Sequence, residues 1–163
     1  MIVLDLPLLV ASAVDAGITV ATAESLTGGL VAATLVQVPG ASGMYQGGVI
    51  AYQNSVKAGI LGVSEALLES AGSVDPQVAR EMALGACRAT GARVGISTTG
   101  VAGPEPHDGK PVGSVYIGVA LDGVAQAYEY HFDGDRALIR QQACDEGLSL
   151  LQQVVAQVRE QNL

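Results

Sequence analysis

The sequence predicts an α/β fold: a three-layer α/β/α sandwich with a mixed, mostly parallel five-stranded sheet. Short β-branched apolar segments alternate with longer segments of helical periodicity, the order that places helices on both faces of parallel strands. Near the C-terminus, two alternating segments flank Asp122-Gly123, a pair typical of a tight hairpin, so one strand must run antiparallel. With 163 residues and no internal repeat or linker, residues 1–163 are expected to form a single domain.

The first part of the chain is expected to run helix, strand, helix. Apolar residues at helical spacing predict a helix over 6–16, which Gly17 is placed to end. The β-branched segment 18–21 predicts the first strand. The apolar segment 30–36 predicts the next helix, because Pro39-Gly40 stops it.

The second strand is expected over 44–52, a segment rich in Gly, Val, Ile and Tyr. Asn54 then starts a short helix that carries Lys57, and Ser64 caps another helix over 65–69. Asp75-Pro76 combines a cap with proline at the first helical position, and it opens a longer helix over 77–90. The remaining elements are a third strand over 93–98, hairpin strands over 112–121 and 124–132, and a helix capped by Asp135 that runs to about 157.

Composition limits the classes of partner. A net charge of -8 argues against nucleic acid, because nucleic-acid binding rests on basic surface. No apolar run approaches the roughly 18 residues of a membrane span, and residues 1–5 lack a basic signal-peptide region, so we expect a cytoplasmic protein away from membranes. Cys87 and Cys144 are interpreted as buried thiols in a reducing compartment. No residues show metal-ligand spacing, so neither a metal nor a cofactor is expected.

The segment 21–29 contains the first candidate site. A Ser, a Thr and two glycines stand between a strand and a helix, where free backbone N–H groups can stabilise an anion or a developing oxyanion. Ordinary N-capping by Ser25 or Thr27 is an alternative explanation of the same residues. The third strand runs into Thr98-Thr99-Gly100, and ligands bind beyond the carboxyl ends of parallel strands. Ser25 and this second segment are therefore expected to share one cleft.

Five motifs follow one another along the chain. They are Ala-Glu-Ser-x-Thr-Gly-Gly at 23–29, Tyr52 with Lys57 five residues on, Gly-x-Ala-Gly-Pro at 100–104, Lys-Pro-Val-Gly at 110–113, and His-Phe-x-Gly-Asp-Arg at 131–136. Together they resemble the CinA C-terminal domain family, the nicotinamide-nucleotide amidases (PncC-type), over about residues 6–157. The resemblance implies hydrolysis of nicotinamide mononucleotide to nicotinate mononucleotide and ammonia, in pyridine nucleotide salvage. It also implies a serine nucleophile, Ser25, with Lys57 and Tyr52 nearby.

Two positions depart from the family pattern. Leu26 stands where the family usually has Cys, which argues that a thiol is not the nucleophile. Glu105-Pro106-His107 replaces a usually Gly-rich loop, and the polar, turn-rich segment 104–110 around it is expected to be mobile.

Residue chemistry supports the same interpretation. Amide hydrolysis needs a nucleophile, a base, an acid for the departing ammonia and donors for the oxyanion. The two histidines offer no Ser-His-Asp arrangement, since His107 lies in a loop and His131 at a strand end. A lysine can replace the histidine if it is desolvated, and the apolar neighbours of Lys57 suit this, although a solvated helix-face lysine is the alternative. Tyr52 either hydrogen-bonds the pair or is a core strand residue.

Substrate contacts are assigned to further residues of the motifs. Thr27, Gly28 and Gly29 can offer N–H groups to the oxyanion. Glu24 orients Lys57, faces the pyridinium cation, or only complements the positive helix N-terminus. The 5′-phosphate needs separate donors, and the candidates are Thr99, Gly100, Lys110, Arg136 and Arg140. Ala102 and Gly103 are expected to contact the substrate as well. Arginine suits phosphate because its planar fork binds two oxygens. Lys110 and Arg136 lie inside the motifs, whereas an arginine placed like Arg140 is more often a surface charge.

Two other functions are compatible with the sequence. One is a non-catalytic nucleotide-binding module with a regulatory role in competence or DNA damage, and the other is an amidase for a different small amide. The intact set Ser25, Tyr52 and Lys57 favours the enzyme. The expected partners are a small-molecule nucleotide and, from the glycine-rich second strand and apolar helix faces, further copies of the chain in a homodimer or higher homo-oligomer.

Overall fold

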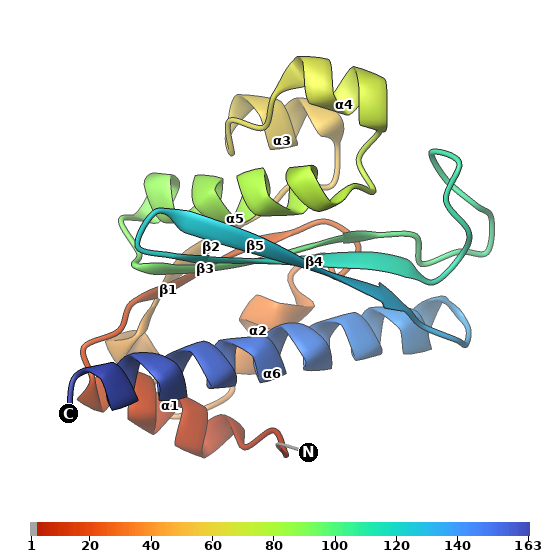
Figure 1. Ribbon diagram of the computed structural model, residues 1–163. Helices are drawn as coiled ribbons and strands as arrows, with labels where there is room; N and C mark the ends of the chain where they lie inside the picture. Colours follow the sequence, from red (N-terminus) through yellow and green to blue (C-terminus); the bar gives the residue numbers. More distant parts are fainter. Residues whose placement is uncertain (1–2) are drawn as a thin grey trace.

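A computed structural model describes residues 3–163 and places a five-stranded sheet between two layers of helices (Figure 1). The strands are β1 (Val20–Glu24), β2 (Tyr45–Ile50), β3 (Val94–Gly100), β4 (Ser114–Leu121) and β5 (Val124–His131). Their order across the sheet is β2-β1-β3-β4-β5. β1 is parallel to β2 and β3, and β4 is antiparallel to both of its neighbours. The predicted sandwich with a mixed, mostly parallel sheet is confirmed.

Helices cover both faces of the sheet (Figure 1). One face carries α1 (Leu6–Asp15), α2 (Leu30–Val36) and α6 (Arg136–Gln161), and the other carries α3 (Asn54–Gly59), α4 (Glu65–Ala71) and α5 (Pro76–Thr90). The predicted caps are confirmed, because side chains of Ser64, Asp75 and Asp135 each accept an N–H from the first turn of the helix that follows. No helix among the described residues is long and apolar enough to cross a membrane.

Each face of the sheet has its own core. On the α6 face, Ile96, Ile117 and Leu148 belong to one large buried cluster, and on the α5 face Met82 belongs to another. Gly95 and Gly118 allow α5 to lie directly on β3 and β4, because a Cβ at either position would collide with a main-chain oxygen of α5. The sheet is therefore held rigidly from both sides, with its carboxyl edge left for the site.

Several element boundaries differ from those predicted. β2 is shorter than the expected 44–52, β4 begins two residues later than expected, and α6 continues to Gln161. β3 extends to Gly100 because it pairs with β4 as far as Gly100–Val115. Gly113, at φ +93°, makes the turn that delays the start of β4. Thr99 and Gly100, which the sequence placed after the strand, therefore belong to β3 itself.

Candidate active site

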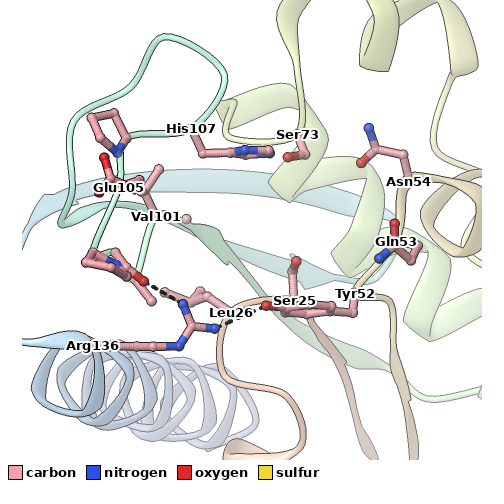
Figure 2. A pocket seen from close by; sticks show the side chains of 15 residues that line it. Ser25, Leu26, Tyr52, Gln53, Asn54, Ser73, Val101, Glu105, His107 and Arg136 are labelled. Carbon is pink, nitrogen blue, oxygen red and sulfur yellow. Dashed lines mark hydrogen bonds between the residues drawn. The ribbon is translucent and has the colours of Figure 1, made fainter.

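Ser25 lies directly after β1 and joins it to the end of β3, because its N–H donates to the carbonyl oxygen of Thr98 (2.9 Å). A cavity of about 470 Å³ opens at this edge of the sheet. Figure 2 shows its labelled side chains converging from the strand ends, from the segment after β2 and from the start of α6. The lining residues are Ser25, Leu26, Tyr52, Gln53, Asn54, Ser73, Gly100, Val101, Ala102, Gly103, Pro104, Glu105, Pro106, His107 and Arg136.

Lys57 lies on the short helix α3, where it is only 1% exposed and contacts Ser25 from the side of the protein interior. Its Nζ donates to Ser25 Oγ (3.1 Å) and to the carbonyl oxygens of Ala51 (2.9 Å) and Tyr52 (3.2 Å). Burial lowers the pKa of Lys57 from 10.5 to about 8, against the opposing effect of the Asp108 carboxylate. A neutral amine has two N–H bonds and one lone pair. With the two carbonyls holding the N–H bonds, the lone pair is left for the hydroxyl of Ser25.

The lowered pKa of Lys57 predicts a pH-dependent cost in stability. The folded state holds this proton less tightly than the unfolded state, so the contribution of Lys57 to stability is lost as pH falls through about 8 and is fully present above about 10.5. Lys57→Met removes the titration. We therefore expect the stability of the Met variant relative to wild type to be about 2 kcal/mol greater at pH 7 than at pH 9.5. Urea unfolding of both proteins at the two pH values measures it, and a constant difference would show an ordinary, solvated lysine.

Glu24 is 1% exposed and caps α2 instead of facing the cavity. Its Oε1 accepts from Thr27 Oγ1 (2.6 Å) and from the N–H of Val31 (2.8 Å), and its Oε2 from the N–H of Ala32 (3.1 Å). Of the three roles expected for Glu24, the structure supports the one at the helix N-terminus. Neither Ser25 nor Thr27 caps this helix. The expectation that its N–H groups stabilise an oxyanion is corrected, because Glu24 already occupies them.

The turn after Ser25 offers other N–H groups. Those of Leu26 and Thr27 have no acceptor among the described residues, whereas Gly28 N–H donates to the carbonyl of Ser25 (3.1 Å). Gly28 and Gly29 take φ of +57° and +102° and form the turn. The Gly28 N–H is therefore not free for an oxyanion, whereas the Gly29 N–H, like those of Leu26 and Thr27, has no acceptor among the described residues. Arg140 donates to the carbonyls of Leu26 (2.9 Å) and Thr27 (3.0 Å), which orients the peptide groups that carry the N–H of Thr27 and the N–H of Gly28.

Tyr52 is 56% exposed and lies on the wall of the cavity. Its hydroxyl makes no hydrogen bond with Ser25 or Lys57; it accepts one from Arg136 Nη2 (3.1 Å), and the Tyr52 main-chain carbonyl contacts Lys57 instead. Arg136 also donates through Nη1 to the carbonyl of Gly103 (2.6 Å), as the dashed lines in Figure 2 show. Arg136 thus links two walls of the cavity. The expected contact of the Tyr52 hydroxyl with the Ser–Lys pair is corrected.

The remaining predicted contacts divide into two groups. Gly100, Ala102 and Gly103 line the cavity together with Arg136. Thr99, Lys110 and Arg140 do not line it: Thr99 Oγ1 donates to the carbonyl of Ser73 (2.7 Å), and Lys110 belongs to a turn with His107.

Sequence reasoning missed Gln53 and Asn54, although they lie between Tyr52 and Lys57 in a recognised motif. Ser73 and His107 carried no local signal for a place in the wall. Among residues 3–163, no cluster of three or more His, Cys, Asp or Glu side chains is placed to hold a metal ion.

Fold and site together define an α/β protein with a ligand cleft at the carboxyl ends of its parallel strands. Within that class, the chain belongs to the CinA family: the model of the CinA C-terminal domain matches residues 7–155. A relative from Bacillus velezensis, named for competence and damage induction, is 41% identical over 86% of this chain, and one of the same name from Halothermothrix orenii is 48% identical over 74%. The chain spans about a third of the length of these relatives, 34% and 30%.

Solved structures of similar proteins share the whole fold. A CinA superfamily protein from Klebsiella pneumoniae matches with a TM-score of 0.88 at 30% identity, covering 93% of this chain and 96% of its own. One from Escherichia coli matches with a TM-score of 0.85 at 32% identity, covering 91% and 90%. These solved chains are thus close to this chain in size, whereas the relatives described above are much longer.

Proposed function

We propose that this chain is an amidohydrolase that converts nicotinamide mononucleotide to nicotinate mononucleotide and ammonia. The observation that carries the proposal is the buried contact of Lys57 Nζ with the Oγ of Ser25 (3.1 Å), a residue that lines the cavity. With a pKa of about 8, roughly one tenth of Lys57 is neutral at pH 7. That fraction is ready to accept the Ser25 proton, which an ordinary lysine is not.

In the first half of the reaction, Ser25 Oγ attacks the amide carbonyl while its proton passes to Lys57 Nζ. The carbonyl π electrons move onto oxygen, and the N–H groups of Leu26 and Thr27, which have no other acceptor among the described residues, are the candidate donors for that oxyanion. The tetrahedral intermediate collapses, the C–N bond breaks, and protonated Lys57 gives its proton to the departing nitrogen. Ammonia leaves and an ester with Ser25 remains.

In the second half, water replaces ammonia. Lys57, neutral again, takes a proton from the water as its oxygen attacks the ester carbonyl, and the proton returns to Ser25 Oγ when the ester bond breaks. The nicotinate nucleotide is released. One buried lysine therefore serves as base and acid in turn, which agrees with the absence of any hydrogen bond from a histidine to Ser25 or Lys57 among the described residues.

The cavity suits a mononucleotide. Its volume of about 470 Å³ lies within the roughly 300–1,000 Å³ usual for small-ligand sites. Arg136 is the arginine that lines it, and we assign it to the 5′-phosphate because a guanidinium fork binds two phosphate oxygens. Arg140 is not assigned this role, because it does not line the cavity and its guanidinium binds the carbonyls of Leu26 and Thr27.

Arg136→Ala should raise KM for nicotinamide mononucleotide about tenfold to hundredfold and weaken the preference over nicotinamide riboside, which lacks the phosphate. The matched control is Arg93→Ala, at the opposite end of β3, where Arg93 pairs with Asp122. Steady-state kinetics on both substrates measures the effect. An unchanged KM would contradict the assignment of Arg136. The phosphate would then be assigned to the N–H groups of Ala102 and Gly103, which have no acceptor among the described residues.

Ammonia release from purified protein tests the proposal. We expect release from nicotinamide mononucleotide, much slower release from the riboside, and little from free nicotinamide. If ammonia were released only from another small amide, the proposed amide hydrolysis would stand and the proposed substrate would be wrong. Binding of the nucleotide without release of ammonia would make the chain a non-catalytic nucleotide-binding module.

A further inference from the structure

The segment 103–110, called the wall segment below, forms one side of the cavity. Gly103, Pro104, Glu105, Pro106 and His107 line it. The segment is fixed at its base, where Arg136 Nη1 donates to the carbonyl of Gly103 (2.6 Å). The contacts at the far end of the segment determine whether its lining residues are held in a fixed position.

The far end of the wall segment is a closed turn, within the part of the chain that the sequence predicts as a mobile loop. His107 and Lys110 exchange two main-chain hydrogen bonds (3.2 and 2.9 Å) around Asp108 and Gly109. These two residues have φ of +50° and +72°, the left-handed pair that closes a two-residue hairpin. Aspartate tolerates this conformation better than most residues. Asp108 therefore stands at the tip of a short, well-defined hairpin.

The side chain of Asp108 docks on a second structural element. Its Oδ2 accepts from both the N–H (2.9 Å) and the Oγ (3.0 Å) of Ser73, in the turn between α4 and α5. The fit is close: a Cβ at Gly72 would lie 2.8 Å from the Cβ of Asp108. Ser73 is itself held by Thr99 Oγ1 on β3, which donates to its carbonyl (2.7 Å). The hairpin tip is thus tied through Ser73 to the rigid sheet.

We propose that Asp108 is a positioning residue, which pins the tip of the wall segment onto Ser73 and so fixes the side of the cavity that faces the substrate. With Arg136 at the base and Asp108 at the tip, the lining residues between them are held at both ends. The expected effect of Asp108 on turnover rests on the proposed function. The anchoring of the hairpin tip by the Asp108–Ser73 contact does not.

Asp108 also has an electrostatic effect on Lys57. Its own pKa is lowered, first by the N–H of Ser73, then by the Ser73 hydroxyl and the nearby His107 and Lys57. It is therefore an anion at neutral pH, and its charge raises the pKa of Lys57 against the larger effect of burial. Two neighbours contact the Asp108 carboxylate. His107 Nε2 lies 3.3 Å from Asp108 Oδ2, and the N–H of Ser73 donates to the same oxygen.

Two variants separate the pin from the charge. Asp108→Asn removes the charge and one strong acceptor, so we expect KM to rise about tenfold and the acid limb of the pH–rate profile to move to lower pH. Ser73→Ala keeps the charge and removes only the hydroxyl bond, so we expect a smaller rise in KM and no movement of the limb. Asp133→Asn, a matched control on an exposed loop between β5 and α6, should change neither.

Amide hydrogen exchange tests the pin without any substrate. In Asp108→Ala the Ser73 N–H loses its acceptor, and we expect its exchange to accelerate at least tenfold, with faster exchange at the His107 and Lys110 amides. Exchange as slow as in wild type would overturn the pin. If exchange accelerates but KM stays within twofold of wild type, the positioning role is overturned. Because exchange is read on the free protein, failure of the amidase proposal would leave this result intact, and the two claims fail separately.

Discussion

Ser25→Ala should abolish turnover, by about 10⁴-fold or more, while nicotinamide mononucleotide still binds within a fewfold of its wild-type affinity. The hydroxyl is the proposed attacking group, and loss of a nucleophile removes the covalent route altogether. The fold should tolerate the change, because the side-chain hydroxyl contacts Lys57 and caps no helix. Single-turnover kinetics with calorimetric binding of the nucleotide measures both halves of this prediction.

The matched control is Ser64→Ala, since Ser64 does cap a helix: its Oγ accepts from the N–H of Leu67 (3.2 Å). That variant should lose about 1 kcal/mol of stability and keep its kcat. The reverse pattern, with Ser25→Ala unstable but its folded fraction fully active, would make Ser25 a structural residue.

Lys57→Arg should be nearly as inactive as Lys57→Met, with a loss of about 10²–10⁴-fold in kcat. Arginine keeps the positive charge but cannot release its proton near neutral pH, so the variant separates a base from a charge that only stabilises. The longer, planar guanidinium must also fit where Lys57 is 1% exposed, so both variants need a thermal unfolding control. Methionine preserves the volume and removes the proton chemistry.

Activity of the arginine variant above about a tenth of wild type would contradict the base assignment. In that case Lys57 would act through its charge, and a water molecule would have to take the Ser25 proton. Tyr52 is poorly placed for that part, because its hydroxyl is hydrogen-bonded to Arg136.

The sequence predicted the fold well because the relevant signals are local. The hairpin around Asp122-Gly123 and the caps of α4, α5 and α6 depend on a few adjacent residues each. The ends of β2 and β3 were misplaced because strand length depends on the partner strand, as the pairing of Gly100 with Val115 illustrates. Such pairing between distant segments leaves little trace in either segment alone.

The site was predictable at the level of which segments meet, and less so at the level of what each side chain contacts. The rule that ligands bind at strand ends brought Ser25 and the end of β3 together, and the family resemblance added Lys57. The partners of Glu24, Arg140 and Thr99 depend on side-chain reach in three dimensions, and each proved to hold the protein rather than line the cavity. The anchoring of Asp108 on Ser73 joins residues 35 positions apart and had no signal in the sequence.

The pH dependence of kcat/KM for ammonia release from nicotinamide mononucleotide tests the central claim most directly, because it reports ionisations of the free enzyme. A base that must be neutral gives a rate that rises with pH and levels off above its pKa. The Ser25–Lys57 account predicts a rise with unit slope and a midpoint at about pH 8, the pKa to which burial lowers Lys57. A profile that stays flat between pH 6 and pH 9.5, or falls as Lys57 loses its proton, would contradict it.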